Sequence, residues 1–186
     1  MPMIRETIVI TTDSEGRVHI APIGLIAEDD DWIIAPFRPS TTLDNLMAVP
    51  FATASHTDDV RVFAGCLTGR RDWPTVVSEE VPVPRLAGAL AHAELAVTGM
   101  TDDPQRPRFR CCVVRLTSHV PFQGFNRAKA AVLEAAILVS RHKMLPRERI
   151  ERELNYLQSA VDKTAGPQEF EAWTWLMEKV RSHFGG

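Results

Sequence analysis

Residues 36–46, PFRPSTTLDNL, gather one guanidinium and three hydroxyls at the start of an expected helix. The residues are Arg38, Ser40, Thr41 and Thr42. A helix N-terminus exposes unpaired N–H groups and the positive end of the helix dipole, so it attracts anions. Hydroxyls and a guanidinium add directed hydrogen bonds to such an anion. This corner therefore fits a phosphate site, but the spacing alone favours the plainer interpretation, Thr41 as an N-cap with Asp44 as its capping-box partner.

A second polar cluster lies at the head of a later helical segment. Asn126, Arg127 and Lys129 open the run NRAKAAVLEAAILVSRHKML, which is rich in helix formers. Basic side chains at a helix start oppose the helix dipole. A residue choice that breaks a local rule can mark a functional site. These three residues are therefore candidates for ligand binding, and a solvated surface is the alternative.

Other chemistry finds little support in the sequence. The six histidines are scattered, and they form neither an HExxH motif nor a paired-ligand spacing. His92 and Glu94 share a strand face, but two groups do not make a metal site. We find no GxSxG elbow, Walker loop or GxGxxG fingerprint. We therefore expect no metal site, leave the catalytic residues unassigned, and expect any chemistry to belong to a bound cofactor.

Length, charge and cysteine usage bound the class of protein. The chain has 186 residues and a net charge of −3, with interspersed acids and bases, which argues against nucleic acid as a partner. No apolar run reaches the roughly 18 residues of a membrane span, and the N-terminus lacks signal-peptide features. The chain has three cysteines, none in a CxxC pair, which is typical of a protein whose thiols stay reduced. The expected location is the cytoplasm, and neighbouring Cys111 and Cys112 are expected to point to opposite faces of a strand.

The first two thirds of the chain has the residue pattern of β structure. β-branched runs separated by turn residues predict strands at 5–12, 18–28, 32–37, 51–57, 90–100 and 108–120. Pro22 implies an edge, a bulge or a break in the second strand. Residues 58–67 fit a short helix capped by Asp58 or Asp59, or a strand. Residues 70–88 hold several prolines and predict a long connection with one short helix at most.

The last third is helical. Helices are expected from about residue 126, from Pro146 to Gly166 and over 168–183, besides a short one over 41–49. A block of strands followed by a block of helices indicates the α+β class, and the β block fits a small Greek-key or up-and-down barrel. We expect two domains, a barrel over residues 1–122 and a three-helix region over residues 123–186.

Several segments in this order resemble a little-characterised family of FMN-binding split-barrel proteins. They are ETIVITT, APIG, PFRPSTTLDNL, a strand ending in HTDD, GFNRAKAAVLEAAI and LPRERIERE. The resemblance covers most of the chain, and the wider superfamily includes flavin reductases, flavoredoxin and pyridoxamine-phosphate oxidases. It implies a split β-barrel with a C-terminal helical extension, FMN as the cofactor, and a homodimer with each flavin in a cleft between subunits.

The resemblance also assigns roles to particular residues. In the relatives a hydroxyl-rich turn after the third strand binds the FMN phosphate, a role that falls here on Arg38, Ser40, Thr41 and Thr42. Ile23 and Gly24 would then lie near the flavin ring. Ser55 stands where relatives often have Asn, so it keeps a hydroxyl but lacks the amide's donor and acceptor pair. Asn126, Arg127 and Lys129 match the family's FNRAK segment and are expected to bind phosphate or substrate.

Three functions remain open at this stage. The first is an FMN-dependent oxidoreductase that acts on a small-molecule substrate or electron donor, for which no side-chain base is required. The second is a non-enzymatic flavin-binding protein, or a barrel that holds pyridoxal phosphate, deazaflavin or heme. The third is a dimeric structural protein whose site has decayed. The phosphate corner favours FMN or pyridoxal phosphate over heme.

Overall fold

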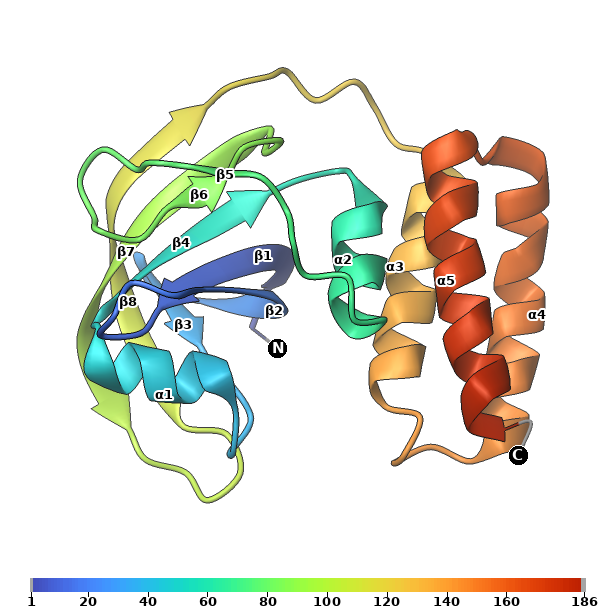
Figure 1. Ribbon diagram of the computed structural model, residues 1–186, viewed down its shortest axis with the longest axis horizontal. Helices are drawn as coiled ribbons and strands as arrows, with labels where there is room; N and C mark the ends of the chain where they lie inside the picture. Colours follow the sequence, from blue (N-terminus) through green and yellow to red (C-terminus); the bar gives the residue numbers. More distant parts are fainter. Residues whose placement is uncertain (1, 185–186) are drawn as a thin grey trace. The chain divides into compact units, whose positions relative to one another are not determined.

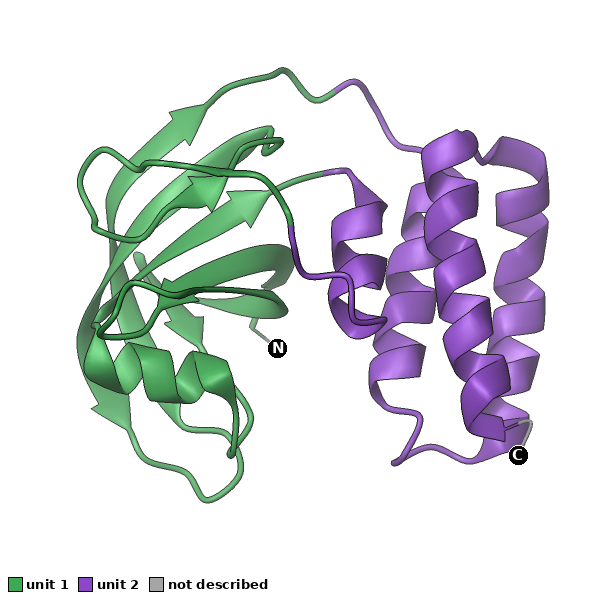
Figure 2. Ribbon diagram, in the orientation of Figure 1, with its two compact units in different colours: residues 1–57, 73–122 green, residues 58–72, 123–186 purple. Residues whose placement is uncertain are grey.

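The computed structural model describes residues 2–184 (Figure 1). The chain forms two compact units, one of residues 1–57 and 73–122, the other of residues 58–72 and 123–186 (Figure 2). The first unit holds the strands and one helix, and the second holds four helices. The expected α+β class is confirmed. None of the helices in the described part of the chain combines the length and the apolar character that a membrane crossing requires.

The first unit is a closed six-stranded barrel with the order β1-β2-β3-β8-β7-β4. The strands are β1 Ile4–Thr12, β2 Val18–Glu28, β3 Asp31–Ile34, β4 Phe51–His56, β7 Ala91–Thr101 and β8 Arg108–Ser118. An up-and-down closure is excluded, because β8 lies beside β3 and β4 lies beside β1. Pro22 lies where β2 pairs with β1 but not with β3, which fits an edge position.

Side chains that alternate along the strands fill the barrel interior. The core includes Leu25, Ile34, Ala54, Leu95 and Phe109. Small residues on β4 and larger ones on β7 and β8 interdigitate, as packing at native density requires. Cys111 lies in this core and Cys112 is only half-buried, so the expected opposite orientation is confirmed. Burial raises the pKa of the Cys111 thiol to about 12, so this cysteine is an inert core group.

The segment between α2 and β7 folds differently from expectation. It forms a short two-stranded sheet of β5 Thr75–Val76 and β6 Arg85–Leu86, which the sequence did not predict, and the short helix that residues 70–88 allowed does not form. Contacts to β4 hold the segment in place, since the Thr53 hydroxyl donates to the Pro84 carbonyl at 2.7 Å. Tertiary hydrogen bonds, and not local propensity, therefore determine its conformation.

The second unit packs four helices together. They are α2 Val60–Leu67, α3 Arg127–Ser140, α4 Arg147–Thr164 and α5 Pro167–Phe184. Asp59 caps α2 by accepting the Arg61 N–H at 3.1 Å, which settles the choice between helix and strand for this segment. Trp173 of α5 is buried and donates to Gln158 of α4 at 3.0 Å, so its indole N–H is satisfied.

Candidate functional site

The hydroxyl-rich corner lies at the start of α1, Thr41–Ala48, directly after β3. Its N-cap is Ser40, not Thr41: the Ser40 hydroxyl accepts the Leu43 N–H at 3.3 Å. The helix is fixed on the barrel, because the buried Asn45 amide donates to the Thr11 hydroxyl at 3.0 Å. The first-turn N–H groups of a helix have no intrahelical partner. The first turn of α1 is therefore a rigid set of donors.

The two threonine hydroxyls remain available at this corner. Thr41 is exposed, while Thr42 has only 3% of its surface exposed. Within residues 2–184 neither hydroxyl makes a side-chain hydrogen bond. A cap requires only Ser40, so the threonines are not needed to close the helix. An anion at the first turn would give both hydroxyls a partner.

Arg38 has an exposed partner that a stronger anion can replace. Its guanidinium donates to the Asp102 carboxylate at 2.6 Å, and the two side chains are 43% and 70% exposed. Its backbone N–H donates to the Gln105 carbonyl at 2.9 Å, which fixes the chain at this point. An exposed ion pair of this kind contributes little free energy. Binding of a phosphate by Arg38 would therefore cost little to the fold.

Arg106 lies at the same corner, although no pattern in the sequence predicted it as a site residue. Its guanidinium lies over the Phe37 ring, 4.7 Å from the centroid, and donates to the Ala35 carbonyl at 2.8 and 3.2 Å. The β7–β8 turn that carries it is ordered by Asp103, which accepts the N–H groups of Gln105 and Arg106. These hydrogen bonds lower the pKa of Asp103. No local pattern signals this contact, because Ala35 and Arg106 are 71 residues apart.

The expected ring contacts, Ile23, Gly24 and Ser55, lie in the same unit as the corner. The Ile23 carbonyl accepts the Thr7 hydroxyl at 2.9 Å. A Cβ atom at position 24 would lie 2.7 Å from a methyl of the Ile4 side chain, so a larger residue there would have to displace that side chain. Ser55 is fully buried, and its hydroxyl accepts the Leu86 N–H at 3.2 Å. This bond uses Ser55 as the acceptor, so its hydroxyl proton is not used by it.

The FNRAK residues lie in the helical unit, apart from the unit that holds the corner. Asn126 is the N-cap of α3: its oxygen accepts the N–H groups of Ala128 and Lys129, and its NH₂ donates to the Thr164 carbonyl. Lys129 forms an ion pair with Asp58. Arg127 is exposed, and among the described residues its guanidinium has no hydrogen bond or ion pair. Arg127 is thus the member of this cluster that is free to bind a ligand.

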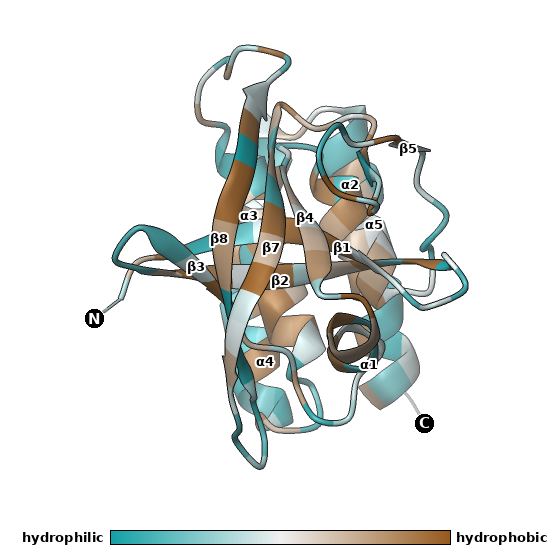
Figure 3. Ribbon diagram, turned by 90° about the vertical axis from the view of Figure 1, so that its left-hand side faces the viewer, coloured by the Kyte–Doolittle hydropathy of each residue, from teal (hydrophilic) through white to brown (hydrophobic). Residues whose placement is uncertain are grey.

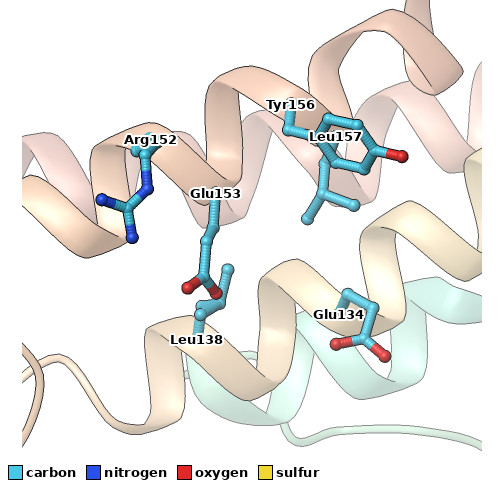
Figure 4. A pocket seen from close by; sticks show the side chains of 6 residues that line it. All are labelled: Glu134, Leu138, Arg152, Glu153, Tyr156 and Leu157. Atoms are coloured by element: carbon cyan, nitrogen blue, oxygen red, sulfur yellow. The ribbon is translucent and has the colours of Figure 1, made fainter.

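The helical unit also has an open groove between α3 and α4 (Figure 4). It is lined by Glu134, Leu138, Arg152, Glu153, Tyr156 and Leu157. Leu138 faces the α4 side chains, and Tyr156 is 83% exposed. The lining includes none of the residues singled out in the sequence, and its carboxylates outnumber its single guanidinium. An anionic cofactor therefore fits the corner on the barrel better than this groove.

Comparisons with known proteins agree with this architecture. The family model described as the N-terminal domain of a protein of unknown function (DUF447) matches residues 5–120. The model for the C-terminal part of the same family matches residues 126–178. No protein of curated function matches the chain. The expected resemblance is confirmed, and the family matches extend across both units.

Solved structures show the same fold. An FMN-bound DUF447 protein from Methanosarcina mazei is 20% identical, with a TM-score of 0.82 over 95% of this chain and 94% of that chain. A 2-nitrobenzoate 2-nitroreductase from Pseudomonas fluorescens is 20% identical, with a TM-score of 0.53 over 61% of this chain and 64% of that chain. Flavoredoxin from Methanosarcina acetivorans is 11% identical, with a TM-score of 0.52 over 63% and 69%.

Proposed function

The chain belongs to the DUF447 family, and on that premise we propose that it is an FMN-binding flavoprotein that acts as an oxidoreductase on a small molecule. One observation carries the proposal. The corner at Arg38–Thr42 offers a guanidinium in an exposed ion pair, free hydroxyls and a helix start, on a barrel whose fold is shared with FMN-bound proteins. In this proposal the barrel domain, residues 1–122, binds the flavin, and residues 123–186 form a separate helical region.

The donor set at the corner fits a phosphate monoester. Arg38 supplies a charged donor, and Ser40, Thr41 and Thr42 supply hydroxyls and first-turn N–H groups. A phosphate has three strong acceptor oxygens, which such a set can satisfy together. Ser40 can cap Leu43 through its oxygen and still donate its hydroxyl proton. The residues present therefore fit the phosphate group of FMN.

The existing hydrogen bonds and ion pairs of the other candidate residues indicate which of them could bind FMN or a substrate. When bound, FMN would supply hydride or single-electron transfer at its ring. Ile23 and Gly24 would line the ring, on the part of β2 that pairs with β1. Ser55 would keep its bond to the Leu86 N–H through its oxygen and would have its hydroxyl proton to donate to the ring. Of the FNRAK residues, Arg127 would bind phosphate or substrate directly, while Asn126 and Lys129 would hold α3 in place.

We also propose that the protein is a homodimer, based on an exposed apolar strip on β8. Beyond Cys111, β8 pairs within the described chain only with β7, so its other edge is free. Val113, Val114 and Leu116 on this stretch are 37%, 46% and 68% exposed, and Figure 3 shows the apolar colour along β8. A free apolar edge favours association. A second copy of the chain would cover it.

Replacing Leu116 with aspartate is expected to weaken this dimer. A charge in the middle of a desolvated contact costs about 2 kcal/mol or more, which is roughly a 30-fold rise in the dimer dissociation constant. Sedimentation equilibrium measures the constant. The control is Met144→Asp, since Met144 is 74% exposed in the connection between α3 and α4 and is not part of β8. Equal effects of the two substitutions, or a monomeric wild-type protein, would remove the dimer proposal.

The visible absorption spectrum tests the flavin proposal. We expect the purified protein, after incubation with FMN and desalting, to retain an oxidised-flavin spectrum that NADH or NADPH bleaches. Retained flavin that neither donor reduces would favour the non-enzymatic flavin-binding protein. Retention of pyridoxal phosphate, deazaflavin or heme in place of FMN would assign another ligand. A protein that retains none of them would return the corner to a helix cap.

A further inference from the structure

A buried carboxylate lies outside the proposed flavin corner, on the side of β7 that faces the loop before β6. Glu94 is fully buried, and its oxygens accept three consecutive backbone N–H groups. The donors are Glu79 at 3.0 Å, Glu80 at 2.7 Å and Val81 at 2.9 Å. Burial alone would raise the pKa of Glu94, but these three bonds and a bond from His92 outweigh it and lower the pKa. Glu94 is therefore an ionised, acceptor-only group.

Two histidines connect this carboxylate to the protein surface through hydrogen bonds. His92 Nε2 lies 3.2 Å from Glu94 Oε1, and His92 Nδ1 lies 3.0 Å from His119 Nε2. The two rings are stacked, with centroids 5.1 Å apart. His92 is only 1% exposed, whereas His119 is exposed. The His119 backbone is fixed by its N–H bond to the Leu90 carbonyl at 2.8 Å.

The hydrogen bonds determine which nitrogen carries each proton. An ionised carboxylate only accepts, so Nε2 of His92 must carry a hydrogen. Neutral His92 then presents a lone pair at Nδ1, so Nε2 of His119 must donate to it. The remaining nitrogen, His119 Nδ1, has no partner among the described residues and is the acceptor at the outer end of the chain. The three side chains thus form one directed row of hydrogen bonds.

We propose that Glu94, His92 and His119 form a proton relay, an acid–base site separate from the flavin corner. A proton binds His119 Nδ1, the Nε2–H bond of His119 breaks, and that proton forms a new N–H bond at His92 Nδ1. The positive charge then rests on His92 beside Glu94, and no heavy atom needs to move. Release follows the reverse order. The relay holds one extra proton. With a second extra proton, both His92 Nδ1 and His119 Nε2 would carry hydrogens that point at each other.

The surroundings of His119 favour its neutral form. The pKa of His119 is lowered, first by desolvation, then by Arg85 on β6 and by His92, while Glu79 opposes the shift. Arg115 of β8 pairs with Glu79 and Glu80, and His56 of β4 has a pKa lowered by desolvation. His119 is therefore neutral and able to accept a proton at pH 7.

The relay suits a small molecule whose reaction at this surface consumes or releases one proton. Hydride addition to a carbonyl or nitro group consumes such a proton, so the relay would serve the proposed oxidoreductase if that function holds. His119 alone would meet the molecule, and His92 and Glu94 would act as positioning residues. The relay itself involves only this chain's side chains and can be measured without flavin.

Nitrogen-15 histidine NMR of the full-length protein without added flavin tests the relay. At pH 7.5 we expect His92 and His119 both as Nε2–H tautomers, and between pH 8 and 5 the pair should take up one proton. Glu94→Gln should lower the midpoint of that uptake by about one pH unit or more, because the carboxylate charge is lost. Glu79→Gln, a matched loss of charge on an exposed side chain, should shift it by a few tenths at most.

A second variant covers the case in which Glu94→Gln does not fold. His119→Gln keeps an amide at the surface and should abolish the one-proton uptake of the pair. Independent protonation of both rings in a folded protein would overturn the relay. So would an Nδ1–H tautomer at His119, or a one-proton uptake that stays unchanged in His119→Gln. These outcomes leave FMN binding untouched, and a failure to bind FMN leaves the relay untouched.

Discussion

A variant that carries Arg38→Ala and Thr42→Val is expected to bind FMN roughly 100-fold more weakly than the wild-type protein. A charge-assisted hydrogen bond contributes about 1.5–3 kcal/mol, so the loss of the guanidinium together with a hydroxyl removes about 3 kcal/mol. Valine keeps the volume of Thr42, which is 3% exposed, so the start of α1 should remain folded. Fluorescence titration with FMN and with riboflavin measures the effect on the two ligands separately.

Riboflavin provides the decisive comparison, because it has the same ring and lacks the phosphate. We expect its affinity to change less than threefold in the double variant. Arg147→Ala is the matched protein control, since Arg147 is an exposed arginine of α4 paired with Glu151 at 2.7 Å and belongs to no part of the corner. Equal weakening of FMN and riboflavin would place the phosphate elsewhere. Unchanged FMN binding would leave the corner as a helix cap alone.

The barrel strands and the helices could be predicted from the sequence because their signals are local. The expected strand 18–28 matches β2, and the expected helix 168–183 lies within one residue of α5 at each end. Turn residues mark the hairpins, since Gly16 has a positive φ of 80° that a side chain disfavours. β-branched alternation and helix formers act within a few residues, so pattern reading captures them.

Closure of the barrel could not be predicted in the same way. β3 pairs with β8 and β1 pairs with β4, and both pairings join segments that are far apart in sequence. The β5–β6 sheet depends on similar distant bonds, including the one between Thr53 and Pro84. Local propensity carries no information on such partners. The Greek-key and up-and-down alternatives therefore stayed open until the structure was known.

The candidate site divides along the same line. The hydroxyls and the guanidinium of residues 38–42 are adjacent, so their chemistry is visible in the sequence. Asp102 and Arg106 reach the same corner from the β7–β8 turn and have no local signature there. His92 and Glu94 were visible as neighbours on one strand face. Their third partner, His119, lies 27 residues beyond His92, so only the folded chain joins the three.

Glu94→Ala is expected to lower the free energy of unfolding at pH 7 by about 3–5 kcal/mol. The substitution leaves three backbone N–H groups and the buried His92 without their acceptor, and removal of one partner from a buried charged network costs this much. Urea unfolding followed by circular dichroism measures the difference. Glu79→Ala is the control, because Glu79 is 57% exposed and forms only a surface ion pair with Arg115.

The pH dependence separates the charge of Glu94 from its packing. Its pKa is lower in the folded than in the unfolded chain, so its charge stabilises the fold above the unfolded pKa of about 4.5. That contribution is lost as pH falls through the folded pKa, because both states are then protonated. The stability gap between wild type and Glu94→Gln should therefore be largest near pH 7 and narrow below pH 4.5. A gap that stays constant from pH 7 to pH 3 would mean that Glu94 contributes through shape alone, and that its carboxylate does not anchor the loop as an anion.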